Sequence, residues 1–305
     1  MLKPLSPSRL PPRPFPAGSI AAQRRKCTYG KCKGDGFIRF TEAGYGFVRE
    51  CVCRTLLRIQ RNLAASGIPE KYREFTLSSQ NGRKPYTIWG PSEPEKWAQV
   101  ANLKAARKLY ERLSRFLKRP RGNPPGLFLH GSPGRGKTML LCALAVDLIN
   151  DGFFGIRFLD CGDLMGLITD AIAEGKPESY VLAPLMRARL LILDDCHPEE
   201  APNPVKLRTK IGAILSHRYN DRRPTLLSSN VSGEAINRHF GNRLASRLKE
   251  YCRFHLAGGG DYRESQAEQK ALEELEEADG DLCEINQNRL KMGSNGAMPA
   301  QNHTS

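Results

Sequence analysis

Eight residues between two apolar segments form the clearest chemical pattern in the chain. Residues 131 to 138 read Gly-Ser-Pro-Gly-Arg-Gly-Lys-Thr, which fits the phosphate-loop pattern G-x-x-x-x-G-K-[ST]. In such a loop the glycines let backbone N–H groups face the phosphates, Lys137 adds a charge for the β and γ phosphates, and Thr138 offers a hydroxyl to Mg²⁺. The pattern predicts a site for ATP and Mg²⁺ made of Gly131, Ser132, Pro133, Gly134, Arg135, Gly136, Lys137, Thr138 and Met139.

Two acids follow a second apolar segment further along the chain. Leu190 to Leu193 is continuously apolar and runs into Asp194 and Asp195, as in a buried parallel strand that presents carboxylates at its C-terminal end. We expect Asp194 to hold Mg²⁺, directly or through water. Asp195 is the candidate general base that polarises the attacking water, although many related ATPases use the longer Glu there.

Polar residues from two later segments complete the candidate site. Thr225 to Ser229 fits a strand that ends at Asn230, whose amide could orient the attacking water or sense the γ phosphate. Arg243 and Arg247 are spaced i, i+4 and share one face of an expected helix. An arginine on a helix can reach the γ phosphate of a neighbouring subunit, whereas a solvated surface position is the ordinary alternative.

Four clustered cysteines precede these segments. Cys27-x4-Cys32 and Cys51-x-Cys53 flank a stretch that resembles a hairpin, with strands over 37–40 and 45–49. A hairpin would bring the two pairs together, and four thiolates at its base would form a closed tetrahedral zinc site that supplies folding energy to a small module. Disulfides or free thiols are the alternatives. The remaining cysteines are expected to be reduced thiols: Cys142, Cys161, Cys196, Cys252 and Cys283.

The spacing of apolar residues predicts the elements that position these groups. Residues 127–129 fit a strand and 138–150 a helix, which places the phosphate loop between them; 96–117 and 205–219 also fit helices. Residues 54–65 fit a basic amphipathic helix. The apolar side of this helix consists of Leu56, Leu57, Ile59 and Leu63. This side either binds a partner or packs on its own domain.

Charge is distributed unevenly along the 305 residues, whose formal net charge is +15. Residues 1–26 are rich in Pro and basic residues, and 264–305 hold nine acids against three bases, so both segments are expected to be disordered. The remainder is strongly basic, which favours contact with nucleic acid or an acidic partner over the alternative of a merely solvated surface. With no apolar stretch of ~20 residues and no signal-peptide core, we expect a cytoplasmic protein without membrane contact.

Taken together, these motifs resemble the AAA+ ATPases of the DnaC/DnaI helicase-loader group and the related IstB transposition ATPases. The resemblance spans roughly 27–263. It rests on the cysteine module, the Gly67–Tyr72 segment, Gly131 to Thr138, Leu190 to Asp195, His217-Arg218-Tyr219, Pro224 to Asn230, Ser246-Arg247-Leu248 and Gly260 to Arg263. The chain departs from the group at Asp195-Cys196-His197, in the wide first cysteine spacer and in an insertion at 86–91.

The resemblance implies an α/β fold: a P-loop AAA+ core with a parallel sheet flanked by helices, preceded by a small cysteine-ligated zinc module. It implies self-assembly through the ATPase domain, with Arg247 completing a neighbour's site and Arg243 or Arg263 as further sensors. It also implies single-stranded DNA binding by the ATPase domain and a grip on the replicative DNA helicase by the N-terminal module.

This interpretation divides the chain into five parts. They are a basic Pro-rich segment (1–26), a zinc module with its helix (27–68), a linker and basic helix (69–125), the AAA+ domain (126–263) and an acidic segment (264–305). The expected activity is ATP hydrolysis by a helicase loader, slow without DNA or partner. The alternatives are an IstB-like transposition helper, against which the cysteine module speaks, and a zinc-containing nucleic-acid-binding protein that uses ATP only as a switch.

Overall fold

The computed structural model describes residues 27, 31–42, 44–77, 84–85, 93–197, 202–231 and 235–261. The expectations for 1–26, for the insertion at 86–91, for Arg263 and for the acidic segment 264–305 lie outside these residues. Within this described part, no helix is both long and apolar enough to span a membrane.

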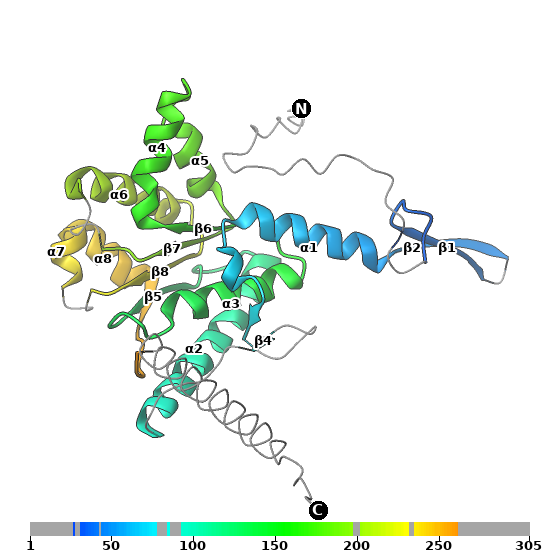
Figure 1. Cartoon of the computed structure of the whole chain (residues 1–305), viewed down its shortest axis with the longest axis horizontal. Coiled ribbons are helices and arrows are strands. Elements are labelled where there is room, and N and C mark those ends of the chain that lie inside the picture. The colour runs from blue at the N-terminus through cyan, green and yellow to red at the C-terminus, as the bar shows by residue number, and fades with distance from the viewer. Residues whose placement is uncertain are drawn as a thin grey trace, which may run out of the picture.

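A five-stranded parallel sheet forms the centre of the molecule (Figure 1). Its strand order is β6-β7-β8-β5-β9, and each neighbouring pair is parallel. The expected strands around the phosphate loop, the acidic pair and Asn230 are confirmed as β5, β7 and β8. The bounds are β5 (Gly126–His130), β6 (Ile156–Asp160), β7 (Leu190–Asp194), β8 (Thr225–Ser229) and β9 (Cys252–Leu256).

Helices cover both faces of this sheet, because successive side chains of a strand point to opposite faces. Leu190 and Ile192 of β7 pack into one apolar cluster with α1, α2 and α3, whereas Leu191 and Leu193 pack into the other with α4 to α8. A strand buried on both faces is expected to be mainly apolar, as β7 is from Leu190 to Leu193 before it ends in Asp194. The helices are α1 (Val52–Ser66), α2 (Glu93–Lys118), α3 (Lys137–Asn150), α4 (Leu164–Ala173), α5 (Ser179–Arg187), α6 (Pro204–Asn220), α7 (Ile236–Phe240) and α8 (Asn242–Tyr251).

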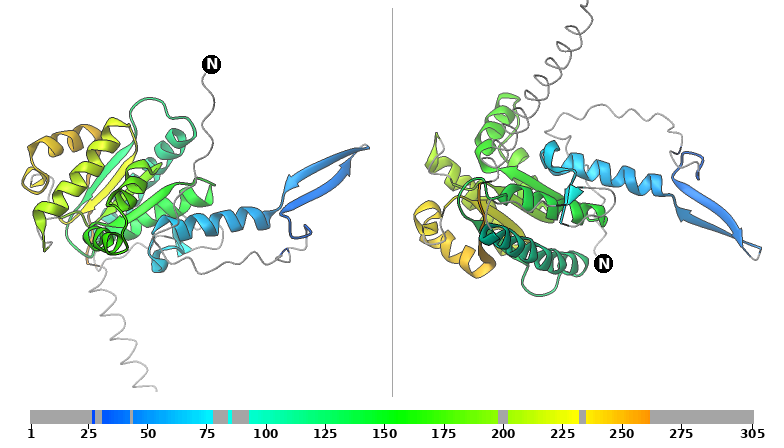
Figure 2. Two further views of the ribbon diagram at one scale, coloured as in Figure 1. Left: turned by 90° about the horizontal axis from the view of Figure 1, so that it is seen from above. Right: turned by 60° about the horizontal axis from the view of Figure 1, so that its bottom comes forward.

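An antiparallel hairpin of β1 (Phe37–Glu42) and β2 (Tyr45–Glu50) precedes α1 and extends away from the sheet in both views of Figure 2. The expected hairpin is therefore confirmed. Short elements connect α1 to α2: the 3-10 helix η1 (Glu70–Tyr72), and β3 (Phe75–Thr76) paired with β4 (Lys84–Pro85).

Helix α1 packs on the apolar interior through its C-terminal half, where Ile59, Leu63 and Ser66 are buried. Ile59 and Leu63 lie in the same apolar cluster as α3, while Leu56 is 37% exposed. Of the two alternatives for this apolar side, packing on the chain itself therefore holds for Ile59 and Leu63. An aspartate at Leu63 would disrupt the core and is not a specific probe of partner binding.

Arg218 of α6 is fully buried, which its charge alone would not predict. Its guanidinium donates to the carbonyl oxygens of Leu185, Met186, Ala188 and Pro224 and to Thr225 Oγ1, at 2.6–3.1 Å. Burial lowers its pKa to about 10, so the side chain stays charged at neutral pH. This residue joins the C-terminal end of α5, helix α6 and the start of β8.

Candidate nucleotide-binding site

The phosphate loop lies between β5 and α3, as the sequence predicts. Gly136, in a left-handed conformation (φ 72°), immediately precedes α3, so the first backbone N–H groups of that helix face the loop. Gly134 also has positive φ (74°), and a Cβ there would lie 1.9 Å from Asp261 Oδ1. The positive φ favours glycine at this position, and the Asp261 side chain of the segment after β9 lies close against it.

Lys137 is the first residue of α3, and its ammonium group is held inside the loop. Nζ donates to the carbonyl oxygens of Gly131 and Ser132, both at 2.8 Å, and to Asn230 Oδ1 at 2.7 Å. The residue is only 7% exposed. A buried cation among backbone N–H groups is suited to binding phosphate oxygens.

Asp194 ends β7 next to Thr138. Its carboxylate accepts hydrogen bonds from Thr138 and from Ser228 Oγ. Burial raises the pKa of Asp194, and the charges of Asp160 and Asp195 raise it further, against the opposing effect of the two hydroxyl donors. A cation beside this carboxylate would favour its charged form. Hydroxyl and carboxylate oxygens are the ligands that Mg²⁺ prefers, so the residues present fit the ion.

Asp195, His197 and Asn230 form a chain of polar contacts at the same end of the sheet. Asn230 Nδ2 donates to Asp195 Oδ1 at 3.1 Å, and His197 Nδ1 lies 3.1 Å from the same oxygen. Asp195 adopts a left-handed backbone (φ 53°), and its N–H donates to Ser228 Oγ at 3.0 Å. Since Asn230 also contacts Lys137, the structure brings the predicted base, the amide and the phosphate-loop lysine together.

These residues line one cavity of about 860 Å³, a size typical of sites for small molecules. Its opposite wall was missed by reasoning from the sequence. Gly67, Pro69, Lys71 and Tyr72, between α1 and β3, line the cavity together with the phosphate loop. A Cβ on Gly67 would lie 2.5 Å from the Phe158 carbonyl oxygen, so this segment passes against β6 only because the residue is glycine.

Arg243 and Arg247 are not among the described residues that line this cavity. Both lie on α8, and the Arg247 guanidinium packs over the Tyr219 ring, 5.3 Å from its centre. Within its own chain, Arg247 is therefore not part of the nucleotide cavity.

The four predicted cysteines meet at the base of the hairpin. All four Sγ atoms lie within 4.8 Å of one another, with Cys27 to Cys51 at 3.7 Å and Cys32 to Cys53 at 3.5 Å. Two thiolates about 2.3 Å from a tetrahedral zinc ion would be roughly 3.8 Å apart. The donor set and its spacing therefore fit zinc.

One expectation about the cysteines is wrong. Cys161 and Cys196 were predicted to be free thiols, but the structure joins them as a disulfide, with Cα atoms 5.5 Å apart. They meet because β6 and β7 are neighbouring strands in register, Asp160 opposite Asp194, so the segments that follow them are adjacent. Cys142 and Cys252 are free and buried, as expected; Cys283 lies outside the described residues.

Comparison with known proteins supports a nucleotide-binding role for this region. Residues 123–268 match the family described as IstB-like ATP binding protein. The replicative helicase loader DnaI of Bacillus subtilis (strain 168) is 30% identical over 139 residues, which cover 43% of this chain and 42% of that relative. The chain thus matches less than half the length of this curated relative. These matches confirm the resemblance to the DnaC/DnaI group in the ATPase region.

Solved structures give likenesses of lower identity. A crystal structure of the DnaC helicase loader has a TM-score of 0.46 and 23% identity, covering 62% of this chain and 99% of that one. A crystal structure of DnaI has a TM-score of 0.44 and 20% identity, covering 64% and 93%. AMPPCP-bound DnaA from Aquifex aeolicus has a TM-score of 0.47 and 18% identity, covering 68% and 56%.

Proposed function

We propose that this protein hydrolyses ATP and uses the cycle of binding and hydrolysis to load the replicative DNA helicase. The observation that carries this proposal is the convergence of Lys137, Thr138, Asp194, Asp195 and Asn230 on one cavity. The similarity to DnaI, a replicative helicase loader by description, supports the choice of partner.

The chemistry follows from what each side chain can reach. Lys137 and the first N–H groups of α3 bind the phosphates, and Thr138 with Asp194 would hold Mg²⁺, which would neutralise charge on the phosphates. Asp195 is 45% exposed at its side chain, so water has access to it. Its carboxylate, oriented by Asn230, accepts the proton of the attacking water.

Arg247 acts in trans in this proposal. Its position outside the cavity of its own chain supports a role toward a neighbouring subunit, and its packing on Tyr219 holds the guanidinium at the surface of α8. Self-assembly through the ATPase domain would then make hydrolysis depend on the neighbour.

The hairpin grips the helicase, and zinc bound by Cys27, Cys32, Cys51 and Cys53 holds the hairpin together. The exposed apolar side chains of this region support the assignment, since large apolar residues exposed to solvent can be covered by a partner protein. They continue from the hairpin onto the first turns of α1: Phe40, Tyr45, Phe47, Val48, Val52 and Leu56.

Single-stranded DNA is the proposed second ligand. Residues 1–263 carry a net charge of +21, obtained from +15 for the chain and −6 for the acidic segment. Binding that depends on such charges should weaken by orders of magnitude between low and moderate salt.

The test is capture of a purified hexameric replicative helicase by the full chain, with and without ATP. The proposal predicts capture that is lost when Phe47 and Val48, 44% and 62% exposed, are changed to aspartate. A matched control changes Val205, which is 63% exposed on α6, to aspartate and should leave capture intact. Capture of a transposase in place of the helicase would favour the IstB-like alternative, and ATP binding without DNA-stimulated hydrolysis would favour the switch.

A further inference from the structure

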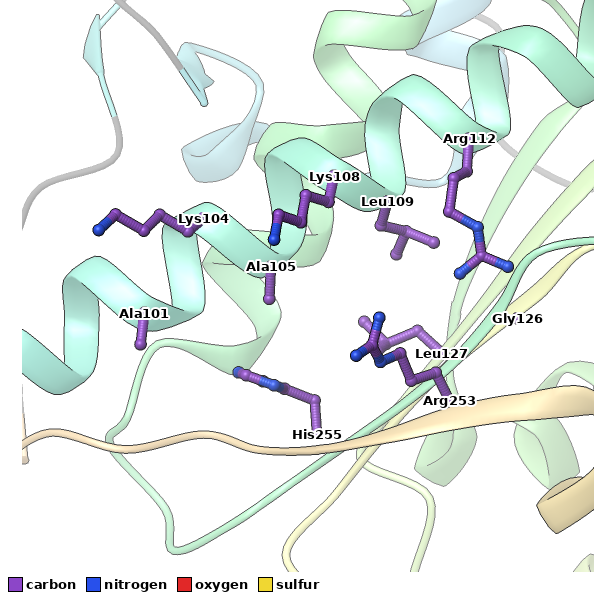
Figure 3. A pocket seen from close by; sticks show the side chains of 10 residues that line it. All are labelled: Ala101, Lys104, Ala105, Lys108, Leu109, Arg112, Gly126, Leu127, Arg253 and His255. Carbon is purple, nitrogen blue, oxygen red and sulfur yellow. The ribbon is translucent and has the colours of Figure 1, made fainter.

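A second cavity, of about 280 Å³, lies on the far side of β5 from β8, between α2 and the pair β5–β9. Its floor is apolar, formed by Ala101, Ala105 and Leu109 of α2 and Leu127 of β5. Figure 3 shows Arg112 reaching down from α2 toward Arg253, while Lys104 and Lys108 extend along the helix. We call this cavity the α2–β9 groove.

The rim of the groove is positively charged. Lys104, Lys108 and Arg112 are spaced i, i+4 and i+8, so they form a row along one face of α2 roughly 12 Å long, and Arg253 faces them from β9. None of the residues that line the groove is acidic, and within the described part of the chain none of these four cations pairs with a carboxylate. Burial and the Arg253 charge lower the pKa of His255 at the edge of the groove, so this imidazole is neutral at neutral pH.

The chain itself leaves β9 at the N-terminal end of this groove. Gly258 is fixed on α2, because Asn102 Nδ2 and Gln99 Nε2 both donate to its carbonyl oxygen, at 2.9 and 3.2 Å. Its N–H donates to Asn102 Oδ1 at 3.3 Å. Three residues further on, the Asp261 side chain lies against Gly134 of the phosphate loop, so only the Gly258 contact places the chain beside the groove.

The segment after Asp261 carries the negative charges that the lining of the groove lacks. Residues 264–284 contain nine acidic residues and one lysine. Apolar residues recur among these acids at spacings of three and four residues: Ala267, Ala271, Leu275 and Ala278. A segment with this pattern can place apolar side chains on the floor of the groove and carboxylates on its cationic rims.

We propose that residues 264–284 dock in the α2–β9 groove of the same chain, with their carboxylates on Lys104, Lys108, Arg112 and Arg253. Two features favour this occupant over a nucleic-acid backbone: the apolar floor, which a phosphate backbone cannot use, and the attachment of Gly258 to α2 beside the groove, shortly before the acidic segment begins. The docked segment covers four cations of the sheet domain and so competes with any polyanion for this surface. The docking itself does not depend on the proposed function.

Carbodiimide cross-linking of the full chain tests the docking. This reagent joins a lysine amine to a carboxylate in direct contact, forming an amide as the activated carboxylate loses its urea leaving group. We expect amides between Lys104 or Lys108 and acids of 264–284, found by mass spectrometry, with a yield that falls as salt rises. A mixture of isotopically labelled and unlabelled chains should show these amides only within one chain.

Charge exchange provides the control. The pair Lys104→Glu and Lys108→Glu should abolish amides from this part of α2 to the acidic segment. Adding Glu273→Lys, Glu274→Lys, Glu276→Lys and Glu277→Lys should restore the amides. The carboxylates would then come from residues 104 and 108, and the amines from the acidic segment. The matched pair Lys118→Glu and Arg119→Glu, exposed at the end of α2 outside the groove, should change nothing. Retained ATP binding would verify that each variant is folded.

Three outcomes would overturn the proposal. One is the absence of any amide between groove lysines and 264–284 in the wild-type chain. The second is amides found only between differently labelled chains, which would assign the groove to a second copy. The third is loss of single-stranded oligonucleotide binding in Lys104→Glu/Lys108→Glu without any amide to the acidic segment in the wild type, which would assign the groove to nucleic acid.

Discussion

The β1–β2 hairpin and the five-stranded sheet differ in what covers their apolar side chains. In the hairpin, Phe40 and Phe47 stack on each other, with ring centres 5.6 Å apart, yet both stay more than a third exposed. In the sheet, β7 and β8 are buried at every position. We therefore expect the hairpin to depend on its four cysteines and the sheet on its own core, so that damage to one should spare the other.

The largest expected effect breaks the hairpin alone. Cys51 is fully buried at the start of α1, and its N–H donates to Gly36 O at 2.8 Å. Structural zinc sites are worth about 10–16 kcal/mol in small modules, so Cys51→Ser should remove the metal and unfold the hairpin. Elemental analysis should fall from about one zinc per chain to none while ATP binding persists. A wild-type hairpin that is folded but free of metal would refute the zinc proposal.

A second test asks whether Arg247 completes the nucleotide site of a neighbouring subunit. Arg247→Ala should reduce hydrolysis by about 10³- to 10⁵-fold if the side chain acts as a trans arginine, while leaving ATP affinity and zinc content unchanged. Mixing Arg247→Ala with Lys137→Ala should restore partial activity, because some interfaces pair an intact loop with an intact arginine. No recovery at any ratio, with co-assembly verified, would exclude a trans role.

A third test separates binding from hydrolysis within one site. Asp195→Asn should keep ATP binding and reduce phosphate release by about 10²- to 10⁴-fold, since it removes the base and keeps the contact with Asn230. Lys137→Ala should lose ATP binding itself, because it removes the charge held among the loop carbonyls. Fluorescent nucleotide binding and phosphate release, measured in parallel, check both. Parent-rate hydrolysis by Asp195→Asn would show that another group is the base.

The smallest expected effects compare two leucines of α1, one in the core of the sheet domain and one next to the hairpin. Leu63→Asp buries a charge in the core shared with α3 and should lower the free energy of unfolding by about 3–5 kcal/mol. Leu56→Asp, on the exposed first part of the same helix, should change it by less than about 0.5 kcal/mol and weaken helicase capture. Denaturant unfolding of both variants measures the contrast. Equal destabilisation would mean that the hairpin and sheet unfold as one unit.

The sequence predicted those parts of the site that depend on local spacing. The phosphate loop, the acidic end of β7 and the amide after β8 are each a strand followed by polar residues, and parallel strands bring such ends to one edge of a sheet. The antiparallel hairpin was predictable from its two strand-like segments and the flanking cysteine pairs, whereas its register was not, since β1 continues to Glu42.

Residues that act through distant contacts were not predictable in the same way. Ser228 orients Asp194 from the neighbouring strand, and nothing in the local sequence distinguishes it from other strand serines. The Gly67–Tyr72 wall and the Cys161–Cys196 disulfide depend on which strands and loops become neighbours. The only local signal was glycine followed by proline at 67–69, which marks a turn without saying what it faces.

Arg218 carries a consequence for the order in which the chain can fold. Its five acceptors come from the end of α5, from Ala188 and from the start of β8, so no single segment can satisfy it. A partly folded chain that buried this guanidinium early would bear a desolvated charge without partners, which costs several kcal/mol. We therefore expect α5, α6 and the start of β8 to become ordered together, because burial of this guanidinium is favourable only when its acceptors from all of these segments are in place.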